Sequence, residues 1–179
     1  MTISITFSST NGGTAITSLD NGSSAAGSNT TEQEVFIRHD GNNPITNCGF
    51  YLAEKSGTYG GNFSAAADLA EILEWGDETT AAAFGGFMLN MDATGGYTTW
   101  STYSSKSGTS YNVCRTGAGD SSTNKILLAT NMGLTGSAGT LQAGDEPNVR
   151  FKCRIAVPSD ETVLGIRQFG QKIHFTYTS

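Results

Sequence analysis

The residues best suited to acid–base chemistry are two histidines, one of which has a carboxylate directly beside it. His39 precedes Asp40 in the segment 39–44, where Asp, Gly, Asn and Pro together are typical of a turn. His174 falls on the polar side of an alternating segment far along the chain. No serine lies in a G-x-S-x-G motif. We therefore interpret His39 as a solvated residue that stabilises a turn together with Asp40, and we predict no serine-based catalytic site.

Neighbouring carboxylates offer a second kind of chemistry. Glu71 and Glu74 lie three positions apart, which a helix would place on one face, and Asp77 follows them. Glycosidases use two carboxyl groups that flank a cleft, so these residues carry a hydrolase alternative. The simpler interpretation is the solvated face of an amphipathic helix. We adopt it and predict that the chain is not an enzyme.

Metal and cofactor chemistry has little support in the sequence. The loops 40–43 and 92–95 combine Asp or Asn with Gly, but neither fits the calcium-loop pattern, and turn formation explains both. Cys48, Cys114 and Cys153 are too widely spaced for a zinc site and too few for a disulfide framework. We predict three buried thiols, no metal and no cofactor.

Three basic residues alternate along one later segment. Arg150, Lys152 and Arg154, called here the basic row, would lie on one face of a strand because side chains alternate across a strand. Two interpretations are open: a solvated outer face, or an interface with an acidic partner subunit or another copy of this acidic chain. The basic row is therefore the candidate subunit interface.

Aromatic side chains in Gly- and Ser-rich loops are the candidates for loop contacts. Trp100, Tyr103 and Tyr111 fall in the stretch 92–124, together with Tyr97. Trp75 lies earlier in the chain. Aromatic rings in loops can stack on sugars, so a carbohydrate- or receptor-binding module is the alternative function.

The composition indicates which elements must position these residues. Ser, Thr, Asn and Gly make up 78 of the 179 residues, and charged residues make up only 15%. Helical surfaces use Glu, Lys, Arg and Gln, whereas Thr, Ser, Asn and Gly suit strands, turns and loops, so a helical bundle is excluded. The net charge of −6 and the ten basic residues indicate no nucleic-acid partner.

Hydropathy gives no sign of a membrane partner or of export. No apolar stretch approaches the roughly 18 residues that span a bilayer. Residues 1–7 lack the basic region and the continuous apolar core of a secretory signal. We therefore expect the protein to be made and to assemble in a cytoplasm.

Alternating and apolar segments predict strands, and the segment 125–129 is expected to be a short buried one. These segments are 2–7, 33–38, 45–53, 87–91, 125–129, 149–157 and 172–178. Residues 64–75 predict one short helix, with Ser64 as N-cap and Gly76 after its end. Residues 8–31 contain few apolar side chains and predict a long exposed loop or arm.

Together these elements predict a single, mainly β domain over residues 1–179. The expected architecture is an Ig-like or jelly-roll-like antiparallel β-sandwich with one short helix and long loops. Strands in 1–53 and 149–179 are expected to pair with each other. The loop-rich region between them, which carries the helix, is expected to hang from one edge or end.

Two parts of the sequence resemble virion structural proteins of tailed bacteriophages. The first is the segment 34–52, which contains Glu-Val-Phe-Ile-Arg-His-Asp-Gly and then Phe-Tyr-Leu. The second is the segment 154–162 with residues 175–178, which is similar to the paired last strands of Ig-like modules joined by a Val-Pro turn. The long middle region with its helix departs from simple Ig-like decoration domains.

The resemblance implies a non-enzymatic component of a phage particle. It would be a capsid decoration or cement protein, or an accessory protein of the tail, collar or baseplate. Its partners would be other virion proteins and further copies of itself as a homo-oligomer. Its location would be the virion, assembled in the host cytoplasm.

Overall fold

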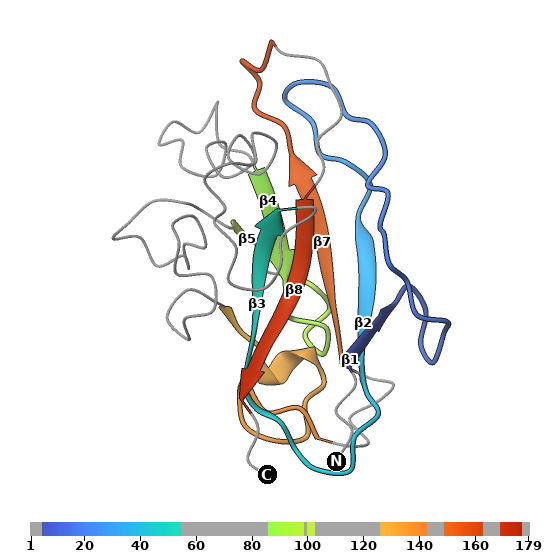
Figure 1. Ribbon diagram of the computed structural model, residues 1–179. Helices are drawn as coiled ribbons and strands as arrows, with labels where there is room; N and C mark the ends of the chain where they lie inside the picture. The colour runs from blue at the N-terminus through green and yellow to red at the C-terminus, as the bar shows by residue number, and fades with distance from the viewer. Residues whose placement is uncertain are drawn as a thin grey trace.

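The computed structural model describes residues 5–54, 86–98, 100–102, 126–142, 149–162 and 169–176, and these are mainly β (Figure 1). They form eight strands and one short 3-10 turn, η2 (Thr130–Met132). The strands are β1 (Ile5–Ser8), β2 (Gln33–His39), β3 (Thr46–Glu54), β4 (Gly86–Asn90), β5 (Ser101–Thr102), β6 (Ile126–Leu127), β7 (Arg150–Ala156) and β8 (Phe169–Thr176). The mainly β prediction is confirmed, and every predicted strand has a counterpart, with shifted ends.

The strands form two antiparallel sheets. One has five strands in the order β1-β2-β7-β4-β5, and the other has three in the order β6-β3-β8. β2 pairs with β7 and β3 pairs with β8, so segments from the two ends of the chain do pair, as predicted. The chain passes from one sheet to the other between β2 and β3, which makes this link a sheet-to-sheet connection rather than a hairpin.

The middle of the chain also contributes strands to the larger sheet, including the predicted strand at 87–91, whereas the region between the two ends was expected to lie outside the paired strands. β4 pairs with β7 over residues 86–90, and β5 extends the same sheet beyond β4. The alternation of β4 explains this position, because Phe87 and Leu89 are buried and Met88 between them is partly exposed. The five-stranded sheet therefore combines early, middle and late segments.

Side chains from both sheets pack into one core. Phe50 of β3 stacks on Phe87 of β4 with ring centroids 5.6 Å apart. It also meets Phe151 of β7 edge-on at 5.5 Å. Around these rings lie the other buried apolar residues: Val35, Ile37, Ile45, Cys48, Leu52, Leu89, Leu128, Met132, Leu134, Leu141, Val149, Cys153 and Ile155. The face of each sheet that points toward this core is called its inner face below, and the opposite one its outer face.

Two sequence predictions about exposure are wrong. His39 is only 3% exposed, because β2 continues through residue 39 and its alternation turns His39 to the inner face with Val35 and Ile37. The segment 125–129 is predicted to be buried, and Leu128 is, yet Leu127 is 46% exposed. Among the described strands β6 pairs with β3 alone, at the edge of the smaller sheet, which leaves room for an exposed side chain.

Hydrogen bonds connect the segment 9–32 to β1 near its start and to β7 near its end. Near its start, the Ile16 N–H donates to the Phe7 carbonyl at 2.8 Å. Near its end, the Thr30 N–H donates to the Ile155 carbonyl at 2.8 Å, and the Thr30 hydroxyl accepts from the Ile155 N–H at 2.9 Å. Most side chains between these ties are exposed, as predicted, while Leu19 packs against the core.

Several sequence predictions lie outside the described residues. They are the helix over 64–75 with Glu71, Glu74 and Asp77, the aromatic residues Trp75, Tyr103 and Tyr111, and the thiol of Cys114. In the described ranges, no helix is long and apolar enough to cross a bilayer.

Candidate functional site

The basic row lies on the outer face of the five-stranded sheet. Phe151, Cys153 and Ile155 of β7 point into the core, so the alternating Arg150 and Lys152 point the other way, as does Arg154. This confirms that the three cations share one strand face. All three side chains are only partly exposed. Arg154 is the most buried of them, with 19% of its side-chain area exposed.

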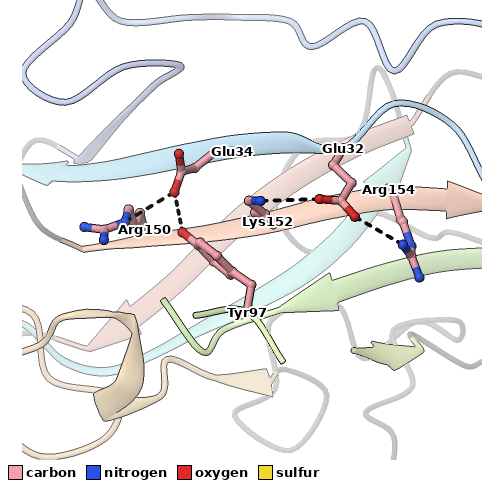
Figure 2. Close-up of polar contacts among 6 residues, drawn as sticks. All are labelled: Glu32, Glu34, Tyr97, Arg150, Lys152 and Arg154. Carbon is pink, nitrogen blue, oxygen red and sulfur yellow. Dashed lines mark hydrogen bonds and ion pairs between the residues drawn. The ribbon is translucent and has the colours of Figure 1, made fainter. Parts of the chain in front are cut away.

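Two carboxylates from the neighbouring segment pair with these cations (Figure 2). Arg150 Nε lies 3.3 Å from Glu34 Oε1. Glu32 bridges the other two, with its oxygens 3.3 Å from Lys152 Nζ and 3.2 Å from Arg154 Nη1. The β2–β7 register places Glu34 opposite Lys152, on the same face as the basic row and diagonal to Arg150, which brings Glu34 within reach of Arg150. The basic row therefore has acidic partners within its own chain, and the intersubunit interface stays a prediction.

Each cation also lies over an aromatic ring. The Arg150 guanidinium is 5.9 Å from the centroid of Phe36, its register partner on β2. Lys152 Nζ is 4.7 Å from the Tyr97 ring, and the Arg154 guanidinium is 4.1 Å from the Trp100 ring. Such cation–π contacts contribute about 0.5–1 kcal/mol at exposed sites and more where water is excluded.

The turn after β4 brings the Tyr97 ring onto the sheet. Asp92 organises this turn: its Oδ1 accepts from the Gly95 N–H and from Asn131 Nδ2, both at 3.1 Å. Its Oδ2 accepts from the Thr98 hydroxyl at 3.1 Å, and its carbonyl accepts from the Tyr97 N–H at 2.8 Å. The sequence interpretation of Asp92 as a turn residue agrees with these bonds.

Tyr97 itself has an unusual backbone. Its φ is +61°, and left-handed values are uncommon outside glycine, at a penalty of about 1 kcal/mol or more. The phenol hydroxyl donates to Glu34 Oε1 at 2.5 Å (Figure 2). Burial and then this contact with the Glu34 carboxylate raise the pKa of Tyr97 well above its ordinary value. The phenol is thus a fixed neutral donor at any physiological pH.

Two donor atoms on this outer face have no hydrogen-bond acceptor among the described residues. Asn90 is fully buried, and its Oδ1 accepts from the Asp92 N–H at 3.0 Å, but its Nδ2 has no hydrogen-bond acceptor among the described residues. Nε of Arg154 is also buried and also has no hydrogen-bond acceptor among the described residues. Asn90 stands opposite Lys152, and Met88 stands opposite Arg154, in the β4–β7 register. The unpaired donors therefore lie on the same face of neighbouring strands.

The residues first considered for acid–base chemistry, His39 and Asp40, do not belong to the group around the basic row. His39 lies elsewhere, with its Nδ1 accepting from the Gly41 N–H at 3.3 Å and its Nε2 donating to the Asn43 carbonyl at 2.9 Å. Asp40 pairs with Arg38 at 2.6 Å rather than with His39. No group of three or more His, Cys, Asp or Glu residues in the described ranges is placed to hold a metal ion.

The sequence predicted the basic row and indicated Tyr97 and Trp100. The pairing of the basic row with Glu32 and Glu34 was not predicted. Glu32 and Glu34 alternate just as the basic row does, and antiparallel pairing of two such segments would bring opposite charges together. That signal was present in the sequence. Asn90 carried no comparable signal, because nothing in the local sequence indicates that a polar residue at the end of this strand is buried.

The two described thiols are buried and free, as predicted. Burial raises the pKa of Cys153 to about 12, and a hydrogen bond from Gln171 Nε2 partly offsets the increase. In the unfolded chain the thiol ionises near pH 8.5. Above that pH the unfolded chain loses a proton that the folded chain keeps, so stability falls as the pH rises toward 12.

We expect the Cys153→Ala variant to lose less stability than the wild type between pH 9 and pH 11. The difference in slope is expected to approach about 1.4 kcal/mol per pH unit, the contribution of one group that titrates only in the unfolded state. Urea unfolding at several pH values measures it. Below pH 8 the two slopes should coincide, and parallel slopes above pH 9 would contradict the argument.

Comparisons with known proteins place this chain in no family. No family model, no curated protein and no solved structure matches it. The class of the protein therefore follows from the fold itself: a mainly β protein with two antiparallel sheets around a shared core.

Proposed function

We propose that the protein is a non-enzymatic structural component of a tailed-phage particle that binds neighbouring subunits. In this proposal the two sheets form an Ig-like or jelly-roll-like β-sandwich, and the protein acts as a capsid decoration or cement protein or as a tail, collar or baseplate accessory. It is located in the virion and assembles in the host cytoplasm. Its partners are other virion proteins and copies of itself.

The observation that carries this proposal is the construction of the outer face of the five-stranded sheet. Its cations are held in place by two kinds of partner. Glu32 and Glu34 form ion pairs with them, and the rings of Tyr97 and Trp100 lie against Lys152 and Arg154. A surface whose side chains are already ordered loses little conformational entropy when a neighbour docks on it. Such preorganisation suits a protein whose task is stable contact with other subunits.

The direct test is the composition of the purified phage particle whose genome encodes the chain. Quantitative mass spectrometry should find the protein in a fixed ratio to the major capsid or tail protein. Cryo-electron microscopy should then show density that fits the two-sheet domain at a regular position. Absence of a stoichiometric copy from the particle would rule the proposal out.

The basic row gives a sharper prediction about assembly. Replacing Arg150, Lys152 and Arg154 together by Ser should leave a folded monomer, because each partly exposed ion pair contributes only about 0–1 kcal/mol. Incorporation into particles should fall severalfold, since the substitution removes the ordered charges of the outer face. Competition between tagged variant and wild-type protein during assembly measures this ratio.

Arg38→Ser is the matched control for this experiment. Arg38 lies on the same outer face, opposite Thr6 of β1, and pairs with Asp40 outside the basic row. We expect its incorporation to equal that of the wild type. Normal incorporation of the triple variant would mean that the basic row is only a solvated face.

A second candidate function is carbohydrate or receptor binding, which the placement of Tyr97 and Trp100 favours. Both rings lie on the outer face of a sheet, beside carboxylates and cations that can bind hydroxyl groups. Ligand sites combine aromatic surface with a few fixed polar groups in this way. A glycan array probed with the folded protein tests this candidate, and binding no higher than background would remove it.

A further inference from the structure

The outer face between β4 and β7 contains two buried donors without acceptors in the described residues. Nδ2 of Asn90 is one, on a side chain with 0% exposure, and Nε of Arg154 is the other. A buried donor left unpaired destabilises a fold by about 1–3 kcal/mol, and more when it is charged. Native proteins seldom keep such groups without a function or a bound partner.

The missing partner must accept hydrogen bonds and should carry negative charge. Both unpaired groups donate, and Lys152 Nζ lies on the same face opposite Asn90. The basic row holds three cations against the two carboxylates of Glu32 and Glu34, so this group of five residues has an excess of one positive charge. A carboxylate has two oxygens with several acceptor positions, and it pairs well with a guanidinium N–H.

Two aromatic rings lie against cations of the same outer face. The Trp100 ring lies against the Arg154 guanidinium at 4.1 Å, and the Tyr97 ring lies against Lys152 at 4.7 Å. Both aromatic residues are partly exposed. Apolar ring surface next to charged donors fits a ligand that has flat C–H faces and a carboxylate on one small unit. A sugar acid has both.

We propose that Asn90, Arg154, Tyr97 and Trp100 form a binding site for a saccharide that carries a carboxylate. The carboxylate accepts from Asn90 Nδ2 and Arg154 Nε, and the sugar ring packs on the aromatic side chains. This inference rests on the second candidate function, glycan binding, and names its ligand class and its site.

The two donor atoms are buried, so a ligand can reach them only if the groups that bury them move. The turn 92–98 carries Tyr97 in a left-handed conformation, which a bulky side chain adopts at an energetic penalty. In this proposal the turn is the part that moves, and the bond from the phenol to Glu34 must break when it does (Figure 2).

The experiment starts from a glycan array that contains carboxylated and neutral saccharides. The best-binding carboxylated saccharide is then compared with its own methyl ester by isothermal titration calorimetry, because the ester keeps the sugar and removes the charge. The variants are Arg154→Gln and Asn90→Asp, the second of which replaces the donor by an acceptor of the same shape. Arg38→Gln is the matched control, since it removes one cation from the same outer face outside the site.

We expect the ester, and each of the two site variants with the acid, to bind at least about tenfold more weakly, as loss of a charged hydrogen bond predicts. Arg38→Gln should bind within about twofold of the wild type. Thermal unfolding checks that every variant is folded. Equal binding of acid and ester would overturn the carboxylate inference while leaving glycan binding intact.

Two further outcomes would overturn the proposal. One is unchanged affinity in both folded site variants, and the other is the absence of any carboxylated saccharide among the binders. Neither outcome bears on the first candidate function, which depends on whether the particle contains the chain. The two conclusions can therefore fail separately.

Discussion

Replacing Phe50 by Ala should lower the free energy of unfolding by about 3–5 kcal/mol, as other Phe→Ala substitutions in well-packed cores do. Phe50 is fully buried and is the ring that joins the two sheets, stacked on Phe87 and edge-on to Phe151. Its removal leaves a cavity between strands of both sheets. Because whole domains are stable by only about 5–15 kcal/mol, we expect a large fall in the urea midpoint.

Leu127→Ala is the control for the Phe50 variant. Leu127 lies on β6, which pairs with β3 next to Phe50, but its side chain is 46% exposed. Its loss should change the free energy of unfolding by less than about 1 kcal/mol. Equal effects of the two substitutions would show that Phe50 does not join the sheets in the way described.

The second large effect is expected for His39→Leu. The His39 ring accepts from the Gly41 N–H and donates to the Asn43 carbonyl, so it holds the turn that leads from the first sheet to the second. Leucine fits a buried site but leaves the buried Gly41 N–H without this acceptor. We expect a loss of about 1–3 kcal/mol in the free energy of unfolding.

His39→Asn provides the comparison that separates hydrogen bonding from packing. Asn has a carbonyl that can accept from Gly41, and so it should recover part of the stability that Leu loses, despite its smaller size. Urea unfolding of both variants measures this difference. A Leu variant more stable than the Asn variant would mean that apolar packing dominates at residue 39.

The sequence predicted well those features that depend on local alternation. The β7 strand and the common face of Arg150, Lys152 and Arg154 followed from a period of two, which needs no knowledge of the rest of the chain. Burial of Cys153 is part of the same alternation. The same reasoning placed β2 correctly, although it ended the strand one residue too early.

That one residue changed the interpretation of His39. A turn was expected to begin at residue 39, which implied a solvated side chain, whereas the strand continues and buries it. Strand ends depend on pairing with a partner strand, here Ile5 of β1, which local sequence does not reveal. An error of one position at a strand end was therefore enough to predict an exposed side chain where the structure has a buried one.

The partners of the candidate site could not be predicted residue by residue. Lys152 and Glu32 lie 120 positions apart in the sequence, and only the β2–β7 register brings them together. Tyr97 reaches Glu34 because of a turn with a left-handed residue, a conformation that the residue type disfavours. Alternation selects a face of a strand, whereas contacts across strands depend on the whole fold.

The pairing of β2 with β7 also has a consequence for the order of events during synthesis. β7 lies between β2 and β4 in the larger sheet, and β8 pairs with β3 in the smaller one. Neither sheet can therefore be completed until the ribosome has released residues 150–176. Until then β2 and β3 expose unpaired edges, and folding depends on closing loops of more than a hundred residues, which favours slow folding and a need for chaperones.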